Sequence, residues 1–299
     1  MSDPEEQRPV LARTLGGVLP SLVAWAVGTV GSSRSSALIR IGLGFMIWAR
    51  FASDQLPFRH ELGWHTAFSL SFYLATAMMV AGVLTRLSTF VAGVLTFSFY
   101  YYFGLVLGVE PYTHHHTYWL GIATILCSLT PSGKSFSVDR WWAVRQARAS
   151  GQPPPPEAGN LWGLRLIVIQ LTMMYLWSAY DKSHAGFLGG DRLEAIFMRY
   201  YIGSNLADWA TWSWAFAVVA WSVVILEYAL ALGMPFARTR KYLVIPGLML
   251  HAAFYVMVPV ATYSATIVLL YLAYFDADKI HRVIDELGGW AIDRDSASH

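Results

Sequence analysis

The sequence carries little charge for its length. Only 13% of the 299 residues are Asp, Glu, Lys or Arg, whereas 56% are hydrophobic and the mean hydropathy is +0.43. A soluble domain has about 25% charged residues, so this composition predicts a polytopic membrane protein. The net charge is only +2 and no basic patch stands out, so we expect no nucleic-acid partner.

Cysteine is almost absent, and so are the features of a cleaved leader. The single cysteine, Cys127, lies inside an apolar run, which leaves no internal disulfide framework. The first six residues are acidic and polar, without the basic segment and short apolar core of a cleaved signal peptide. We therefore expect the first spanning helix to act as an uncleaved signal anchor.

Long apolar runs are abundant, and each is a candidate spanning helix because a bilayer core of about 30 Å needs roughly 20 apolar residues. The eight runs are Ala37–Phe51, Thr66–Leu84, Phe90–Gly108, Tyr118–Leu129, Leu161–Tyr180, Trp212–Met234, Leu243–Val260 and Ala265–Phe275. Leu15–Val30 contains two glycines and a proline, and we interpret it as surface-lying or re-entrant. The sequence thus predicts an all-α bundle of about eight transmembrane helices.

The distribution of lysine and arginine predicts which loops lie on the cytosolic side of the membrane and which lie on the outer side. If the N-terminus is inside, the outer loops hold only Arg59, Lys182, Arg192 and Arg199, and the other loop cations fall inside. Both termini are therefore expected in the cytosol. The predicted organisation is a tail and interfacial segment (1–35), a transmembrane domain (36–275) with a proline-containing cytosolic linker (131–160), and a cytosolic tail (276–299).

This topology brings two unusual groups to the outer face. Lys182 follows Asp181 at the end of one run, and His114-His115-His116 precede another. A lysine at a helix end either snorkels to the headgroups or, when desolvated, becomes a neutral amine that can act as a base. Asp181 would favour the charged form, but adjacent residues on a helix point about 100° apart.

Two further titratable residues, Glu227 and His251, lie inside apolar runs. A charge at mid-bilayer costs roughly 2.5–3.5 kcal/mol, so Glu227 must be protonated, paired or facing a cavity. A lone histidine such as His251 often joins helices by a hydrogen bond. Arg40 and Arg165 lie near inner span ends, where we expect them to snorkel.

The three consecutive histidines are a candidate metal site. Glu110 and His114 have the i, i+4 spacing of helical ligand pairs, and His184 could add a further ligand. Three consecutive histidines do not suit a single ion on a regular helix, so we predict no metal.

Three motifs occur in a fixed order along the chain. They are His116–Gly121 followed by Ser137-Val138-Asp139, Ser178–Lys182 followed by Phe187–Gly190, and Leu226-Glu227 followed by Phe236–Arg240 and His251. Together with the apolar runs, they resemble the vitamin K-dependent gamma-carboxylases and their bacterial relatives, the HTTM membrane proteins. The resemblance covers roughly Ile39–Phe275.

The resemblance implies an enzyme in which Lys182 is the catalytic base and His116 supports it. In the carboxylases the lysine deprotonates reduced vitamin K, oxygen adds, and the resulting alkoxide takes a glutamate γ-proton so that carbon dioxide can add. The implied cofactors are a reduced quinone of the vitamin K or menaquinone type and oxygen, with carbon dioxide as a further substrate. The candidate substrate- or cofactor-binding residues are His115, Tyr118, Asp181, His184, Glu227 and His251.

The sequence also departs from the family pattern. Ala179 and Phe187 replace a glycine and a tryptophan, and His114 and His115 replace asparagines. The carboxylases carry a large lumenal domain for peptide substrate, whereas only residues 276–299 follow the last run. We therefore expect a small substrate, a lipid-borne quinone and membrane lipids as partners, in a bacterial inner membrane with the site facing outward.

Three alternatives stay open at this point. Glu227 and His251 are the kind of pair that relays protons in a transporter, and a membrane protein that binds a small molecule without catalysis would carry similar groups. A metal-dependent membrane enzyme would use the three histidines, Glu110 and His184. A purely structural partner subunit needs none of these residues.

Overall fold

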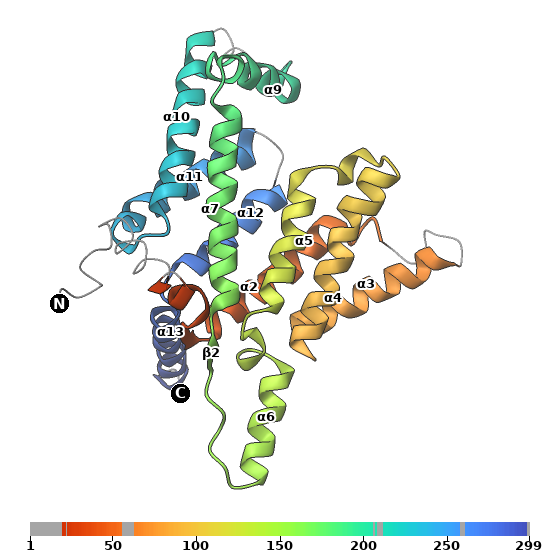
Figure 1. Ribbon diagram of the computed structural model, residues 1–299, viewed down its shortest axis with the longest axis vertical. Coiled ribbons are helices and arrows are strands. Elements are labelled where there is room, and N and C mark those ends of the chain that lie inside the picture. The colour runs from red at the N-terminus through yellow and green to blue at the C-terminus, as the bar shows by residue number, and fades with distance from the viewer. Residues whose placement is uncertain are drawn as a thin grey trace, which may run out of the picture.

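The computed structural model describes residues 20–21, 23–55, 63–205, 207, 212–257 and 261–297, and most of these are helical (Figure 1). The elements in chain order are β1 (Val30–Ser32), α2 (Arg34–Phe51), α3 (Trp64–Ala81), α4 (Thr85–Ser98), the π-helix η2 (Phe99–Val106), the 3-10 helix η3 (Glu110–Tyr112), α5 (His115–Ser128), the 3-10 helix η4 (Ser132–Lys134), α6 (Val138–Ala149), β2 (Ala158–Asn160), α7 (Trp162–Lys182), α8 (Ala185–Leu188), α9 (Asp191–Tyr201), α10 (Ser213–Gly233), α11 (Ala237–Met257), α12 (Ala261–Leu270), the 3-10 helix η6 (Tyr271–Tyr274) and α13 (Ala277–Ala297).

The predicted all-α class is confirmed, because each of the eight apolar runs lies mainly in helix. Within the described part of the chain, two helices are long and apolar enough to cross a membrane: Thr85–Val106, which joins α4 and η2, and α10. The full set of eight spans and the cytosolic position of both termini stay predictions. Of the segment Leu15–Val30, residues 15–19 and Leu22 lie outside the described residues.

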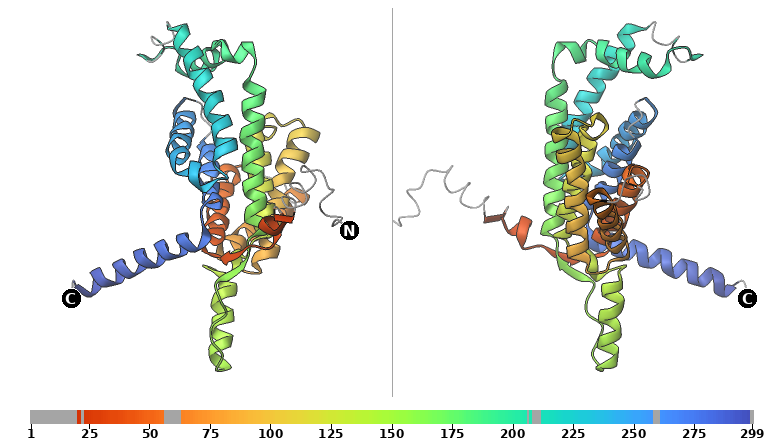
Figure 2. Two further views of the ribbon diagram at one scale, coloured as in Figure 1. Left: turned by 60° about the vertical axis from the view of Figure 1, so that its left-hand side comes forward. Right: turned by 90° about the vertical axis from the view of Figure 1, so that its right-hand side faces the viewer.

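The helices pack in two groups that share α2. In one group α7 and α10 lie side by side, with α11 and α12 behind them, and in the other α3, α4 and α5 lie together (Figures 1 and 2). Glycines allow the closest approach in the second group, since a Cβ on Gly121 would lie 2.9 Å from the Cα of Phe97 in α4. Such small residues let helix backbones come together where apolar side chains alone give little preference for one partner.

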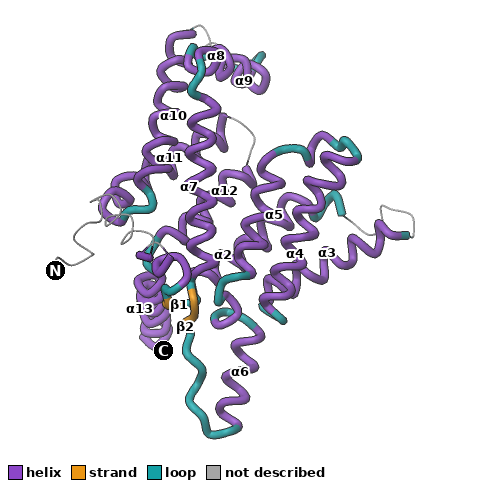
Figure 3. Tube along the Cα trace, viewed as in Figure 1, coloured by secondary structure: helices purple, strands orange, loops and turns teal. Residues whose placement is uncertain are grey.

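The bundle has two different ends. At one end, called the α6 end, α6 and α13 project away from the helices and β1 pairs antiparallel with β2 (Figures 2 and 3). At the other, called the α8–α9 end, the short helices α8 and α9 lie across the tops of α7 and α10 (Figure 1). The predicted linker 131–160 is therefore structured, because it contains η4, α6 and β2.

The Ser-Val-Asp motif fixes the α6 end. Ser137 caps α6 by accepting a hydrogen bond of 2.9 Å from the backbone N–H of Arg140. Asp139 reaches back to the start of α4, where its carboxylate accepts from the N–H groups of Leu84 (3.0 Å) and Thr85 (2.7 Å). One turn thus satisfies the first N–H groups of two helices, which have no partner inside the helix.

Arg40 corrects the expectation that it snorkels. Its side chain is fully buried, at 0% exposure, and donates to the carbonyl oxygens of Met79 (2.5 Å), Val80 (3.1 Å) and Phe136 (2.6 Å). Two of these carbonyls are at the end of α3, where a cation is favoured by the helix dipole. Sequence position alone does not distinguish this role from snorkelling.

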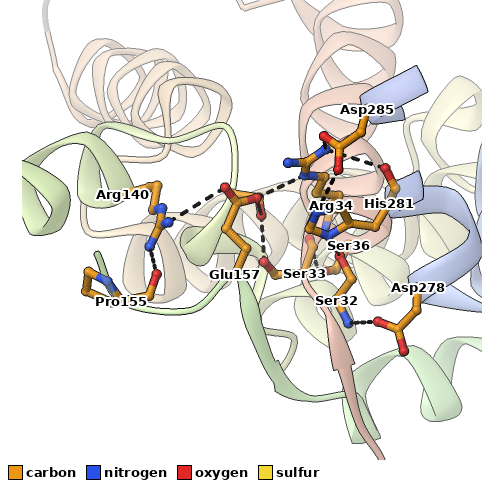
Figure 4. Close-up of polar contacts among 11 residues, drawn as sticks. Ser32, Ser33, Arg34, Ser36, Arg140, Pro155, Glu157, Asp278, His281 and Asp285 are labelled. Atoms are coloured by element: carbon orange, nitrogen blue, oxygen red, sulfur yellow. Dashed lines mark hydrogen bonds and ion pairs between the residues drawn. The ribbon is translucent and has the colours of Figure 1, made fainter. Parts of the chain in front are cut away.

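Glu157, just before β2, joins the elements of the α6 end (Figure 4). Its carboxylate accepts from Arg34 at 3.0 Å and from Ser135 at 2.7 Å, and Arg140 lies 3.7 Å away. Burial alone raises the pKa of Glu157, but the hydrogen bonds from Ser135 and Arg34 and the nearby positive charges outweigh it, so the pKa lies below its ordinary value.

The same arginine anchors α13, which forms most of the predicted tail 276–299. Arg34 pairs with Asp285 of α13, and His281 lies 3.2 Å from the same carboxylate (Figure 4). The backbone N–H of Ser32 donates to Asp278 at 2.9 Å. The guanidinium of Arg34 holds the pKa of the exposed Asp285 below its usual range.

Candidate functional site

Lys182 and Glu227 form an ion pair between α7 and α10. The Lys182 Nζ donates to both carboxylate oxygens, at 2.8 and 2.9 Å. Ser178, one turn before the lysine, donates its hydroxyl to the same carboxylate at 3.0 Å and also contacts the Lys182 amine. The carboxylate is buried at 3% exposure, while the lysine side chain is 23% exposed. The amine therefore lies between a buried acid and the outside of the bundle.

The two helices explain why these groups meet. Ser178 and Lys182 are four residues apart, so they lie on one face of α7. Glu227 is the acidic residue of α10, whose other members are almost entirely apolar. A carboxylate in such surroundings needs a partner because burial without one costs far more than a lost hydrogen bond. The packing of α10 on α7 supplies Lys182 and Ser178 as partners.

The segment after Lys182 is held against α10 by the Phe-Leu-Gly-Gly motif. Phe187 is 5% exposed and packs with Ala220 and Val224 of α10. Gly190 has a φ of +91°, and a Cβ there would lie 2.5 Å from the backbone nitrogen of Ala217. Only glycine combines this backbone conformation with so close an approach. The motif thus fixes the chain just beyond the ion pair.

His251 occupies a second buried polar centre, between α7, α11 and η6. Its Nε2 and the Tyr175 hydroxyl are 2.6 Å apart, and the same hydroxyl is 2.6 Å from that of Tyr271. The ring of Tyr263 lies 6.2 Å from the His251 ring. The Nδ1 of His251 is buried and has no hydrogen-bond partner among the described residues. The predicted role of a helix-joining hydrogen bonder fits this geometry.

The three consecutive histidines lie at the start of α5. The His114 Nε2 lies 3.5 Å from a carboxylate oxygen of Glu110, and the His114 and His116 rings stack with their centroids 5.1 Å apart. The His116 ring also lies 6.4 Å from that of Tyr263. Tyr263 therefore lies near both His116 and His251. The predicted support of Lys182 by His116 stays a prediction, and the His115 side chain lies outside the described residues.

The side chains of the other predicted binding residues take no part in the ion pair. Tyr118 is 37% exposed and packs on Phe97 and Tyr100 rather than among the buried polar groups. Asp181 and His184 are exposed. The carboxylate that neutralises Lys182 is thus that of Glu227, not that of its neighbour Asp181. Roles for Tyr118, Asp181 and His184 in binding stay predictions.

The sequence indicated the main residues of the site but not the residues to which they are hydrogen-bonded. It selected Lys182, Glu227 and His251 separately, but it did not join the first two or identify Ser178 and Tyr175. The i, i+4 spacing of a serine and a lysine before a helix end was the available signal. Among the described residues, no cluster of three or more His, Cys, Asp or Glu side chains is arranged to hold a metal ion.

Two described helices are long and apolar enough to cross a membrane, and one of them, α10, carries a buried acid paired with a lysine, as the rare charged residues of membrane helices usually are. A comparison with protein families places this chain more narrowly. The HTTM domain matches residues 51–278, which is most of the chain, and the protein belongs to the HTTM family. This domain is associated with vitamin K-dependent carboxylase-like membrane proteins. Neither the comparison with curated proteins nor that with solved structures gives a significant match.

Proposed function

We propose that the protein is a multi-pass membrane enzyme of the vitamin K-dependent carboxylase-like type, with Lys182 as its base. The observation that carries the proposal is the pairing of Lys182 with a buried Glu227, at 2.8 and 2.9 Å, while the lysine side chain stays 23% exposed. The amine faces the outside of the bundle and has a buried acid behind it. It can therefore exchange a proton with a substrate on one side and with Glu227 on the other. Family membership is the second support.

The pair gives Lys182 a route to its neutral form. In the ion pair the ammonium cannot accept a proton, but transfer of one proton over 2.8 Å to Glu227 leaves a free amine and a neutral carboxylic acid. A poorly solvated environment reduces the free-energy difference between these forms because it penalises both charges. The amine then takes a proton from the substrate, while the Ser178 hydroxyl holds the carboxyl group in place.

The exposed faces of α7 and α10, the two helices that carry the pair, suit a substrate that arrives through the lipid. On α7 and α10 the large side chains of Trp177, Tyr180, Trp221 and Ile225 are 71%, 67%, 53% and 62% exposed. Apolar surface of this kind is compatible with acyl chains and with an apolar ring. A quinol hydroxyl is a hydrogen-bond donor, and the Lys182–Glu227 pair supplies both an acceptor and a proton store.

The proposed cosubstrates are a reduced quinone and oxygen, which would together supply a strongly basic oxygen species able to remove a carbon-bound proton. A small substrate would be oxygenated, or carboxylated with carbon dioxide. His116 is proposed to orient groups at the same face of the membrane. The protein is proposed to lie in a bacterial inner membrane with the α6 end in the cytosol, because the cations concentrate at that end.

The purified full-length protein in detergent tests this proposal. It is incubated with reduced menaquinone and oxygen, and oxygen uptake and quinone epoxide are measured. We expect both in the wild type and in Arg192→Ala, which changes an exposed residue of α9. We expect at least a hundredfold loss in Lys182→Ala, as is typical for removal of a general base.

The outcome that rejects the proposal is equally clear. If oxygen uptake and epoxide in the wild type do not exceed those of Lys182→Ala, the lysine is not the base of a quinol oxygenation. Size-exclusion chromatography of each variant shows whether a loss reflects misfolding.

A proton-coupled transporter is the second candidate, and one observation favours it. Tyr271, Tyr175 and His251 form a continuous hydrogen-bonded chain inside an apolar bundle, with 2.6 Å at each link. Such chains carry protons in membrane proteins. Liposomes with a pH-sensitive dye would show proton flux that Tyr175→Phe abolishes, whereas the enzyme proposal predicts that this variant retains quinol-dependent oxygen uptake.

A further inference from the structure

A second site lies at the α6 end, far from the ion pair. It is a pocket of about 360 Å³ between the start of α7, the start of α11 and the junction of η6 with α13. Its lining residues are Arg165, Ala237, Arg240, Lys241, Tyr274, Phe275, Asp276 and Lys279. Arg165 and Lys182 are 17 residues apart on α7, which corresponds to about 25 Å.

The pocket carries an excess of positive charge. Four cations face one carboxylate, that of Asp276. The Oδ1 of Asp276 accepts from the backbone N–H groups of Asp278 (3.0 Å) and Lys279 (2.9 Å) and so caps α13, and its single negative charge does not balance the four cations. None of the four cations forms an ion pair within 4 Å in the described part of the chain. Charge of this density, partly withdrawn from water, is unfavourable without an anion.

The two arginines are held in place by contacts that leave some of their N–H groups available as hydrogen-bond donors. The Nε and one amino group of Arg240 donate to the carbonyl oxygens of Met234 (2.8 Å) and Pro235 (2.9 Å). The guanidinium of Arg165 lies 4.9 Å above the ring of Trp25, and its buried Nε has no partner among the described residues. Both arginines line the same pocket. Such a pair resembles the fixed donor sets that recognise phosphate oxygens.

We propose that this pocket binds a phosphate group. The two arginines would donate to its oxygens, and Lys241 and Lys279 would neutralise its remaining charge. Exposed aromatic rings beside the pocket, those of Trp25 and Phe275, provide apolar surface for the rest of the molecule. The phosphate belongs either to the headgroup of an anionic phospholipid or to a soluble phosphate, and basic pockets at the cytoplasmic ends of membrane helices are known to take headgroups.

The purified full-length protein in a zwitterionic detergent tests the site by thermal unfolding and by native mass spectrometry. Three additions are compared: phosphatidylglycerol, phosphatidylcholine and inorganic phosphate. The variants are Arg240→Gln, Arg165→Gln and the exposed Lys241→Gln/Lys279→Gln pair, which removes charge without touching a buried group. Arg238→Gln is the matched control, because it removes an exposed cation of the same helix that does not line the pocket.

We expect phosphatidylglycerol to raise the Tm of the wild type and of Arg238→Gln by several degrees and to be retained in the mass spectra, with phosphatidylcholine ineffective. The pocket variants should lose most of both effects. If inorganic phosphate reproduces the stabilisation with the same dependence on the variants, the ligand is a soluble phosphate. If no phosphate compound stabilises the wild type, or if Lys241→Gln/Lys279→Gln and Arg240→Gln respond as Arg238→Gln does, the site is rejected.

Discussion

At the scale of single residues, the candidate site is built around one buried carboxylate, whose burial is costly without hydrogen-bonding partners. Glu227 lies in an apolar helix at 3% exposure, and its two oxygens accept from Lys182 and Ser178. Removing one member of a buried pair leaves the other charge without compensation, whereas replacing both by apolar groups is often neutral or stabilising. The pair is thus costly as a purely structural device, which favours a functional role.

The first prediction concerns the stability of this pair. Lys182→Met should destabilise the protein, by less than the 3–5 kcal/mol or so typical of a fully buried pair, because the lysine is 23% exposed. The double variant Lys182→Met/Glu227→Leu should recover most of the loss, since no unpaired charge remains. Thermal unfolding in detergent measures both. A double variant that is less stable than the single one would show that the pair is a net stabilising contact.

The residues of the site could be found in the sequence, but their partners could not. An acid in an apolar run, as at Glu227, indicates a buried group that needs compensation. Its partner is 45 residues earlier in the chain, and only the register in which α10 packs on α7 determines which residue it is. The same holds for Tyr175 and His251, which are 76 residues apart. The hydroxyl of Tyr175 meets the ring of His251 only in the packed bundle.

At the scale of elements, the short helices after α7 hold the chain beyond the ion pair against α10. Gly190 begins α9 with a φ of +91° directly against the backbone of α10. Phe187 fills the space beside it. Phe187 thus supplies the buried aromatic ring of this motif.

The second prediction uses the two glycines of this region. Gly190→Ala should destabilise the protein by more than the roughly 1–2 kcal/mol that the left-handed conformation alone costs, because a Cβ there meets the Ala217 nitrogen at 2.5 Å. Gly203→Ala is the matched control, with a φ of +84° and no atom within 4 Å of the added Cβ. Equal shifts in Tm for the two variants would contradict the close packing of this turn on α10.

Most helices could be predicted from apolar runs, whereas the structured linker could not. The segment Val138–Ala149 contains Trp141, Trp142 and several arginines, so it has no continuous apolar run to mark it as helix. Its start is encoded in the Ser137 cap and in Asp139, whose role involves the distant turn at Leu84. Long-range caps of this kind leave no periodic pattern in the sequence.

At the scale of the whole molecule, the two ends of the bundle differ in chemistry. The α6 end contains the buried Arg40, the Arg34–Glu157–Asp285 cluster and the basic pocket, whereas the Lys182–Glu227 ion pair lies toward the α8–α9 end. An end rich in cations is the one that membrane insertion retains in the cytosol. The proposed orientation follows from this difference.

The third prediction concerns pH at the α6 end. The pKa of Glu157 is lower in the folded state than its ordinary value of 4.5, which applies to the unfolded chain. The ionised carboxylate therefore stabilises the fold to its full extent when the pH is above 4.5. This stabilisation is lost as the pH falls from there through the lower folded pKa. Glu157→Gln should therefore be less stable than the wild type at pH 7, with the difference shrinking below pH 4.5.

Thermal unfolding as a function of pH measures this effect. Glu286→Gln, an exposed carboxylate of α13, is the control and should follow the wild type throughout. A difference between Glu157→Gln and the wild type that grows as the pH falls would contradict the assigned sign.

The central claim is that Lys182 exchanges protons with substrate, and chemical rescue tests it most directly. Oxygen uptake with reduced menaquinone is measured for Lys182→Ala in the presence of small primary alkylamines. We predict that the variant is inactive alone and that added amine restores uptake in proportion to its concentration, because the cavity left by the lysine chain admits a free base. A Lys182→Ala protein that is as active as the wild type without any amine would contradict the account.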